Sequence, residues 1–242
     1  MKINTGTIYI RIEFSSDFFL MEKINLEKLK SVLPAVPGIF RKEEYFNSAV
    51  LIPLIEINNE YNFLFEKRSA EIRQGGEICF PGGEFDPGKD RTFQETAIRE
   101  TIEELGIKPD KINIVGALDT FVGPMGITVD SFIALLNVRD LSEFNFDKNE
   151  VEKIFLVPLT FFIENEPEKY KMRLELHSYY LNERGEKVDL LPVKQLGLPE
   201  RYAEPRQGKK HNVYVYKTEK EIIWGITAAL IYELIIKIKK IL

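Results

Sequence analysis

The sequence of 242 residues predicts an α+β domain from three observations. The run from Ser48 to Ile57 is apolar enough for a buried strand. A capping box at Thr92 starts a central helix, and the apolar run from Ile222 to Ile238 predicts a second helix. Further strand-like stretches lie on both sides of the central helix. Strands before and after a helix, with another helix at the end, indicate a layered α+β domain.

The first strand is expected to continue into a hairpin. Residues Tyr61 to Phe65 form its partner across an Asn58-Asn59 turn. Further upstream, Leu26 to Leu33 has a helical pattern, and Thr7 to Phe14 alternates as a strand does. We therefore expect an N-terminal extension over residues 1–24, with an added strand as one alternative, and a main domain over residues 25–242.

The central helix has recognisable ends. The capping box Thr92-x-x-Glu95 predicts a start near Phe93, and Gly106 can end the helix as a C′ residue. Between them an apolar stripe at i, i+4 and i+7 is expected to face the core. The stripe consists of Ile98, Ile102 and Leu105.

Strands are also expected later in the chain, with a long polar loop before the last of them. They are Ile112–Leu118, Ile127–Val138, Val151–Leu159, Arg173–Leu181 and Asn212–Tyr216. The final apolar run is shorter than the roughly 20 residues that a membrane span needs, and it contains Glu233. We therefore expect a buried helix with Trp224 in the core, and no membrane partner.

The composition limits the kinds of partner and compartment. Lys and Arg total 33 against 38 Asp and Glu, so the net charge is −5 and no nucleic-acid partner is expected. The single cysteine, Cys79, excludes an internal disulfide and fits a reducing compartment, which predicts a cytoplasmic protein. Arg11 and Glu13 interrupt the region where a signal peptide would be apolar.

Three carboxylates mark the candidate site. Glu100, Glu103 and Glu104 stand at i, i+3 and i+4 on the central helix, so they share a face and repel one another. Carboxylate oxygens are the ligands that Mg²⁺ prefers, usually together with substrate phosphates. The alternative is a solvated helix face with an ion pair between Arg99 and Glu103. On the metal-binding interpretation, Arg99 is expected to orient the acid cluster and not to contact the substrate.

The residues around this cluster resemble the Nudix box, G-x5-E-x7-R-E-U-x-E-E-x-G-U, in which U is apolar. The stretch from Arg99 to Ile107 matches its second half, with Thr101 at an apolar position. Other segments are similar to the coenzyme A pyrophosphatase branch of that superfamily. They are Leu64–Ser69, Arg73, Gly76, Phe80–Gly83, Val151–Leu159 and Ile223–Ala228.

The sequence departs from the pattern at three places. The segment between Gly83 and Arg99 is two residues too long, and Asp90 lies where the outer glutamate belongs. The upstream motif is one residue short before Phe80, and Asp130 replaces an apolar residue or proline. We expect the two extra residues to bulge out as a surface loop between Asp86 and Phe93, since loop closure entropy grows only with the logarithm of length.

The resemblance implies a Nudix-type α/β/α sandwich with a mixed sheet and a loop–helix–loop box. It implies hydrolysis of a pyrophosphate, assisted by Mg²⁺ or Mn²⁺ on Glu100, Glu103, Glu104 and the Gly83 carbonyl. The branch implies coenzyme A or acyl-CoA, cleaved to 4′-phosphopantetheine or its acyl form and adenosine 3′,5′-bisphosphate. The alternatives are another nucleoside diphosphate derivative, such as ADP-ribose or a dinucleotide, and a non-catalytic nucleotide-binding domain.

A polyanionic substrate needs cations, and Arg68 and Arg73 are the candidates near the glycine turn. The basic stretch from Arg201 to His211 is either a solvated loop or a clamp on the 3′-phosphate of coenzyme A. Glu150 and Glu152 are either surface charges or an additional ligand or base. The expected partner is a nucleotide small molecule, and a homodimer is left open.

Overall fold

The structure, a computed structural model, describes residues 26–242, so the strand expected at residues 7–14 lies outside it. The chain divides into two compact units, Met1–Lys42 and Glu43–Leu242. In the described part of the first unit, α1 (Leu26–Val32) confirms the helical pattern and has no buried residue. The boundary expected between residues 24 and 25 stays a prediction.

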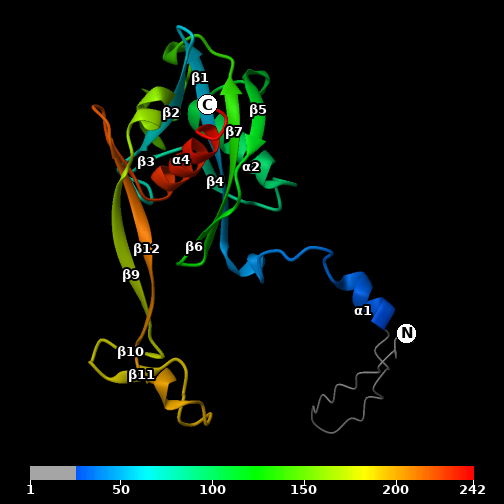
Figure 1. Cartoon of the computed structure of the whole chain (residues 1–242), viewed down its shortest axis with the longest axis vertical. Helices are drawn as coiled ribbons and strands as arrows, with labels where there is room; N and C mark the ends of the chain where they lie inside the picture. Colours follow the sequence, from blue (N-terminus) through cyan, green and yellow to red (C-terminus); the bar gives the residue numbers. More distant parts are fainter. Residues whose placement is uncertain (1–25) are drawn as a thin grey trace. The chain divides into compact units, whose positions relative to one another are not determined.

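A mixed sheet of eight strands forms the centre of the second unit (Figure 1). Its main order is β3-β2-β1-β7-β5, while β4, β6 and β8 pair with β1, β7 and β2. Strands β1 and β7 are parallel, and the other pairs are antiparallel. The strands are β1 (Phe46–Ile57), β2 (Glu60–Arg68), β3 (Ile78–Cys79), β4 (Gly82–Glu84), β5 (Ile112–Ala117), β6 (Phe121–Gly123), β7 (Ile127–Leu136) and β8 (Val151–Pro158).

The predicted hairpin is confirmed. Strands β1 and β2 pair antiparallel, with Leu54 opposite Phe63. Asn58 and Asn59 between them have φ angles of 53° and 63°. Asparagine tolerates this left-handed conformation, which suits a tight hairpin turn.

Helices cover both faces of the sheet. They are α2 (Phe93–Leu105), α3 (Leu159–Glu164) and α4 (Gly225–Ile238), and short 3₁₀ turns occupy Lys42–Glu44, Pro109–Lys111, Leu141–Glu143 and Glu200–Tyr202. One core contains Phe63 and Phe65 of β2, Phe162 of α3 and Ile231 of α4. The other contains Leu64, Ala97 and Leu105, so it lies between β2 and α2. Alternate residues of β2 thus face opposite helical layers, and the predicted α/β/α arrangement is confirmed.

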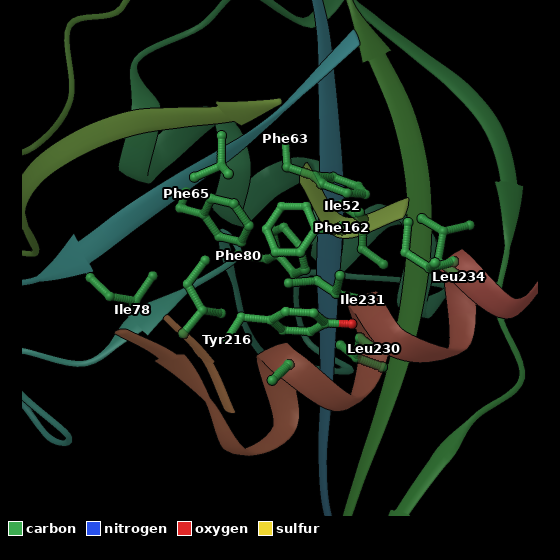
Figure 2. Close-up of a cluster of buried hydrophobic side chains, with 14 of the residues drawn as sticks. Ile52, Phe63, Phe65, Ile78, Phe80, Phe162, Tyr216, Leu230, Ile231 and Leu234 are labelled. Carbon is green, nitrogen blue, oxygen red and sulfur yellow. The ribbon is translucent and has the colours of Figure 1, made fainter. Parts of the chain in front are cut away.

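Aromatic rings dominate the core under α3 and α4 (Figure 2). The rings of Phe65 and Phe80 stack with centroids 5.0 Å apart. The ring of Phe162 meets Tyr216 edge-on at 4.9 Å. Figure 2 shows Ile231 and Leu234 of α4 facing this group. Offset and edge-on ring pairs stabilise a core beyond the area they bury.

The last helix is buried as expected, but it begins later than the apolar run. Residues Ile222–Trp224 form strand β13, and α4 follows with six buried residues. The placement of Trp224 in the core was wrong, since it is 46% exposed. In β13 only the middle residue, Ile223, is buried, so its two neighbours point the other way. Among the described residues, no helix is both long and apolar enough to cross a membrane.

A long two-stranded ribbon was not foreseen. Strands β9 (Glu168–Leu176) and β12 (Arg206–Lys217) run side by side, and β13 pairs with the inner end of β12 (Figure 1). Beyond them lie β10 (Tyr179–Leu181) and β11 (Lys187–Asp189). The prediction of a polar loop up to residue 211 was therefore wrong for Arg206–His211. These residues have few strand-forming side chains, but pairing with β9 supplies their backbone hydrogen bonds.

Candidate functional site

The sequence sets both ends of α2 by local hydrogen bonds. The Oγ1 atom of Thr92 accepts from the backbone N–H of Glu95 at 3.1 Å. Gly106 has φ 62° and donates its N–H to the Ile102 carbonyl at 3.0 Å. The predicted start and end of the helix are thus confirmed. One detail differs from a capping box, in which the Glu95 carboxylate would accept from the N–H of the cap residue, Thr92. Here the Glu95 carboxylate accepts from the N–H of Arg91, one residue earlier, at 2.7 Å.

The buried face of α2 differs from the predicted apolar stripe. Leu105 is fully buried, but Ile98 and Ile102 are only half-buried. Thr96, Ala97, Thr101 and Glu104 are the other buried residues of the helix. The hydroxyl of Thr101 donates to the Ala97 carbonyl at 2.7 Å, which satisfies it inside the core. Position 101 therefore behaves as the apolar position of the box pattern.

Glu104 lies on that buried face, against the glycine turn. Its side chain is 4% exposed, and its Oε2 accepts from the Gly82 N–H at 2.9 Å. Its Oε1 lies 4.0 Å from an Nη1 of Arg68. Burial, followed by repulsion from Glu66, raises the pKa of the Glu104 carboxyl to about 9. The carboxyl is therefore protonated at neutral pH unless a cation replaces the proton.

Glu100 packs on the next glycine. A Cβ atom added to Gly83 would lie 2.5 Å from the Glu100 Cδ, so only glycine leaves room for the carboxylate. Burial raises the pKa of Glu100, against the opposing effect of Arg99. The structure therefore brings Gly83, Glu100 and Glu104 together. Glu103 lies at the margin, with a side chain that is 54% exposed.

Arg99 ties these acids to the loop that precedes the helix. Its Nη1 donates to Glu100 at 2.7 Å and to Glu103 at 3.0 Å. Its Nε and Nη2 donate to Asp90 at 2.9 and 2.8 Å. The hydrogen bonds from Arg99 hold the pKa of buried Asp90 at about 2. Arg99 therefore links Glu100, Glu103 and Asp90 through its guanidinium group.

The extra length of the box forms a compact turn. The backbone N–H groups of Lys89 and Asp90 both donate to the Asp86 carbonyl, at 2.9 and 2.8 Å. The N–H of Gly88 donates to the Asp86 side chain at 2.8 Å. This turn lies between the glycines and Phe93, as the loop argument predicted. At the end of this turn Asp90 lies where its carboxylate accepts hydrogen bonds from Arg99.

The two candidate substrate arginines lie in different surroundings. The Nε of Arg68 donates to the carbonyl of Arg73 at 3.2 Å, while its Nη1 faces Glu104. The guanidinium of Arg73 lies over the Phe46 ring, 5.3 Å from the centroid, and the residue is exposed. The structure thus brings Arg68 to the carboxylates, whereas Arg73 lies exposed beside Phe46.

The basic stretch from Arg201 to His211 divides between a 3₁₀ turn that contains Arg201 and strand β12, which begins at Arg206. The guanidinium groups of Arg201 and Arg206 lie 5.0 and 4.4 Å from the Tyr202 ring centroid. Lys210 is paired with Arg173 in the register of β12 and β9. All three cations are exposed. Arg206 and Lys210 lie on strand β12, in contrast to the loop that was expected, whereas Arg201 lies before the strand.

Sequence reasoning did not select Glu66 as a site residue. This residue of β2 is 1% exposed, and the Cys79 thiol donates to its Oε1 at 3.2 Å. Burial raises the pKa of Glu66 to about 7, and that of the Cys79 thiol well above its ordinary value. The available signal was a glutamate directly after the apolar residues Phe63–Phe65 of the predicted strand.

The two downstream glutamates, Glu150 and Glu152, lie in different surroundings. Glu150 lies close enough to the cluster for its charge to raise the pKa of both Glu66 and Glu100. Glu152 instead forms an ion pair with Lys67 at 3.2 Å. Only Glu150 is therefore a candidate for an additional role at the site.

The donor set suits a hard divalent cation. The groups gathered at the turn are carboxylate and carbonyl oxygens, which Mg²⁺ prefers. Among residues 26–242, no three His, Cys, Asp or Glu side chains lie close enough as they stand to hold a metal ion. Two observations nevertheless favour a cation here. Buried Glu66 and Glu104 repel each other, and the Oε2 of Glu66 has no hydrogen-bond partner among residues 26–242.

A pocket of about 400 Å³ opens beside Arg99 and Glu100 of the box helix. It is lined by Glu84, Phe85, Asp86, Pro87, Lys89, Arg99 and Glu100. A larger pocket of about 580 Å³ lies near the Asn58-Asn59 turn and contains none of the site carboxylates. The smaller pocket is therefore the one that borders the box helix, at Arg99 and Glu100.

Comparison with known proteins agrees with this geometry. The sequence model of the NUDIX domain matches residues 46–176. The "Uncharacterized Nudix hydrolase NudL" of Photorhabdus laumondii is 33% identical over 189 residues, which cover 78% of this chain and 82% of that protein. "Nudix hydrolase 3" of Caenorhabditis elegans is 36% identical over 118 residues, which cover 47% and 48% of the two chains.

A further relative carries a more specific name. The "Peroxisomal coenzyme A diphosphatase NUDT7" of Mus musculus is 34% identical over 116 residues, 48% of each chain. The NUDIX match covers more than half of this chain, and the NudL similarity covers most of both proteins. The arginine-tied glutamate helix and its glycine turn are thus the Nudix box of this protein, and the chain belongs to the Nudix family.

Proposed function

We propose that this Nudix hydrolase cleaves the pyrophosphate bond of coenzyme A or an acyl-CoA. The products are 4′-phosphopantetheine, or its acyl form, and adenosine 3′,5′-bisphosphate. Family membership gives the coarser activity, that of a pyrophosphohydrolase acting on a nucleoside diphosphate derivative. One observation carries the finer proposal: Arg68, from the upstream motif of the branch, meets Glu104 of the box. The similarity to the mouse coenzyme A diphosphatase over half of each chain also supports it.

Nudix hydrolases use divalent metal ions, and we assign Mg²⁺ or Mn²⁺ to this site. The proposed ligands are the Gly83 carbonyl, Glu100, Glu103 and Glu104. When bound, the metal neutralises charge on the diphosphate and lowers the pKa of a coordinated water.

The residues of the chain supply the positioning and the proton acceptor. Arg99 holds Glu100 and Glu103 through one Nη1, and Asp90 holds Arg99. A carboxylate of this group, once ionised, accepts the proton of the water that attacks phosphorus. Glu104 can serve as a ligand only after losing its proton, because burial favours its neutral form.

Substrate charge is met by arginine. Arg68 is half-buried and fixed by its bond to the Arg73 carbonyl, so it is preorganised to grip a phosphate with two N–H groups. Arg73 is exposed beside Phe46, and we assign it to a more distant part of the substrate. A charge-assisted hydrogen bond contributes about 1.5–3 kcal/mol.

The test is turnover of a nucleotide panel by the full-length protein with Mg²⁺ or Mn²⁺. The panel contains coenzyme A, acetyl-CoA, dephospho-coenzyme A, ADP-ribose and a diadenosine polyphosphate. We expect the highest kcat/KM for coenzyme A or acetyl-CoA, and a value at least about tenfold lower without the 3′-phosphate. A clear preference for ADP-ribose or the dinucleotide would instead assign another Nudix hydrolase activity. Binding without turnover would indicate a nucleotide sensor.

A matched pair of variants separates specific recognition from general charge. Arg68→Gln is expected to raise KM for coenzyme A by about tenfold or more, given the energy of a charge-assisted bond. Lys67→Gln is the control, because Lys67 pairs with Glu152 and Glu221. Equal effects of the two substitutions would remove Arg68 from the substrate site.

A further inference from the structure

Glu66 combines deep burial with an unsatisfied oxygen. It is 1% exposed, and its Oε2 has no hydrogen-bond partner in the described part of the chain. The other buried acids at the site differ in this respect. Asp90 is bound by Arg99, and Glu104 accepts from Gly82. Leaving a buried carboxylate oxygen without a partner is costly, so the position needs an explanation.

The strand directs this side chain toward the Nudix box. Residues two apart on a strand share a face, and Leu64 packs in the core that contains Ala97 and Leu105 of α2. Glu66 is the next residue on that face. Arg68, the one after it, reaches Glu104. Glu66 therefore lies between the buried core under α2 and the end of the strand where the box carboxylates gather.

The surroundings of Glu66 are strongly acidic. Its charge is repelled by Glu150 and Glu100, and it in turn repels Glu104. Opposite it on β3, Cys79 offers a thiol, which is a weak donor. Arg68 attracts it, but the Nη1 of that guanidinium already faces Glu104. When these acids are ionised, the protein groups alone leave an excess of negative charge at this point.

We propose that Glu66 is a further oxygen ligand of the divalent metal, supplied by strand β2 and not by the box helix. This rests on the proposed function, which places Mg²⁺ or Mn²⁺ at the box. A hard divalent cation satisfies the unpaired Oε2 and offsets the repulsion between Glu66 and Glu104. In this proposal the segment Leu64–Ser69, which resembles the coenzyme A pyrophosphatase branch, supplies a metal ligand, Glu66, as well as the substrate-binding Arg68.

The experiment measures Mn²⁺ binding without substrate. Free Mn²⁺ is followed by electron paramagnetic resonance, and thermal unfolding is recorded with and without the metal. Glu66→Gln keeps the shape of the side chain and removes its charge. Two controls accompany it: Cys79→Ala removes the thiol donor and keeps the carboxylate, and Glu152→Gln removes an acid that pairs with Lys67.

Wild type is expected to bind Mn²⁺ and to gain Tm on binding. Glu66→Gln should weaken Mn²⁺ binding by at least about tenfold, because even the replacement of a residue that only hydrogen-bonds a metal ligand lowers metal affinity by about that factor. Its Tm without metal should rise, because a buried charge is gone, while the gain on adding Mn²⁺ should shrink. A purely structural role for Glu66 would not produce these opposite changes. The two controls should bind Mn²⁺ as wild type does.

Wild-type affinity in folded Glu66→Gln would overturn the inference and leave the metal site of the proposed function standing. No Mn²⁺ binding by wild type would contradict both. Glu66→Asp gives a second test that keeps the charge and withdraws the oxygens by one methylene. It should fold and bind Mn²⁺ more weakly, and unchanged affinity in this variant would also count against the inference.

Discussion

The guanidinium of Arg99 binds both oxygens of Asp90, from Nε to Oδ1 at 2.9 Å and from Nη2 to Oδ2 at 2.8 Å. The remaining Nη1 of Arg99 holds Glu100 and Glu103. Asp90 is 4% exposed and also accepts from the hydroxyl of Thr96 at 2.9 Å. An acid in the loop before the helix therefore fixes the arginine that arranges the acids on the helix.

Replacing Asp90 by Asn should lower both stability and turnover. Asp90→Asn removes the charge from the hydrogen bonds that Asp90 accepts from Arg99, and a hydrogen bond to a charged group contributes about 1.5–3 kcal/mol. Glu100 and Glu103 still pair with Arg99 in this variant, which limits the loss. Chemical denaturation of Asp90→Asn should show a loss of this order. Asp90→Glu keeps the charge and should lose less. Asp189→Asn, which removes an exposed pair with Lys187, is the control.

Gly83→Ala is expected to fold and to lose activity. The added Cβ meets the end of the Glu100 side chain, which can move aside but then leaves its position. Misplacing a catalytic group by about 1 Å can cost on the order of 100-fold in rate. Gly116→Ala, which meets no atom within 4 Å, should keep both Tm and kcat. If Gly83→Ala retained normal kcat, Glu100 would not belong to the site.

Gly82→Ala should behave differently from its neighbour. A Cβ atom there would lie 2.3 Å from the Ala49 carbonyl oxygen, which is part of the paired backbone of β1. Backbone atoms cannot move aside as a side-chain end does, so the sheet itself must distort. We expect a marked drop in Tm for Gly82→Ala. If the Tm equalled that of Gly83→Ala, the backbone of β1 would accommodate the added Cβ atom, contrary to this prediction.

Glu103→Gln and Glu104→Gln should each cut turnover by at least about 100-fold, since charge stabilisation through a metal is worth several kcal/mol. Both proteins should remain folded by circular dichroism. Glu104→Gln keeps an acceptor for the Gly82 N–H, so the glycine turn should be preserved. Near-normal kcat in either folded variant would contradict the assignment of that residue as a metal ligand.

Metal-free protein should lose stability as pH rises from about 5 to 9. The pKa values of Glu66 and Glu104 are raised from 4.5 to about 7 and about 9 in the folded state. At a pH between the ordinary pKa of 4.5 and the raised pKa of each group, the folded state holds more protons than the unfolded state. The free energy of unfolding therefore falls as the pH increases. Denaturation in the presence of a chelator measures the slope. Glu104→Gln should flatten its upper part, whereas the same slope in that variant would contradict the burial effect.

Local sequence signals predicted the elements that depend on local contacts. The cap at Thr92, the end at Gly106 and the Asn58-Asn59 turn are set by hydrogen bonds or φ angles within a few residues. The buried face of α2 was mispredicted because an apolar pattern ignores polar groups that find partners. Thr101 bonds within its own helix and Glu104 bonds to Gly82, so both enter the core.

The remaining differences come from long-range pairing. Arg206–His211 is a strand because β9, some thirty residues earlier, lies beside it. Trp224 points outward because β13 pairs with β12 before the helix begins. The chemistry of Glu66 depends on Cys79 and on three other acids brought together by folding. Such contacts cannot be inferred from the neighbours of a residue in the sequence.

Strand β12 spans two levels of local stability. At its inner end Tyr216 is 2% exposed and pairs with β13, so opening there disrupts the aromatic core. Every residue from 206 to 212 is exposed, and this part pairs with β9. A two-stranded ribbon with little buried area is only marginally stable. Amide hydrogen exchange should therefore be fast over residues 206–212 and slow toward Tyr216, although one continuous strand carries both.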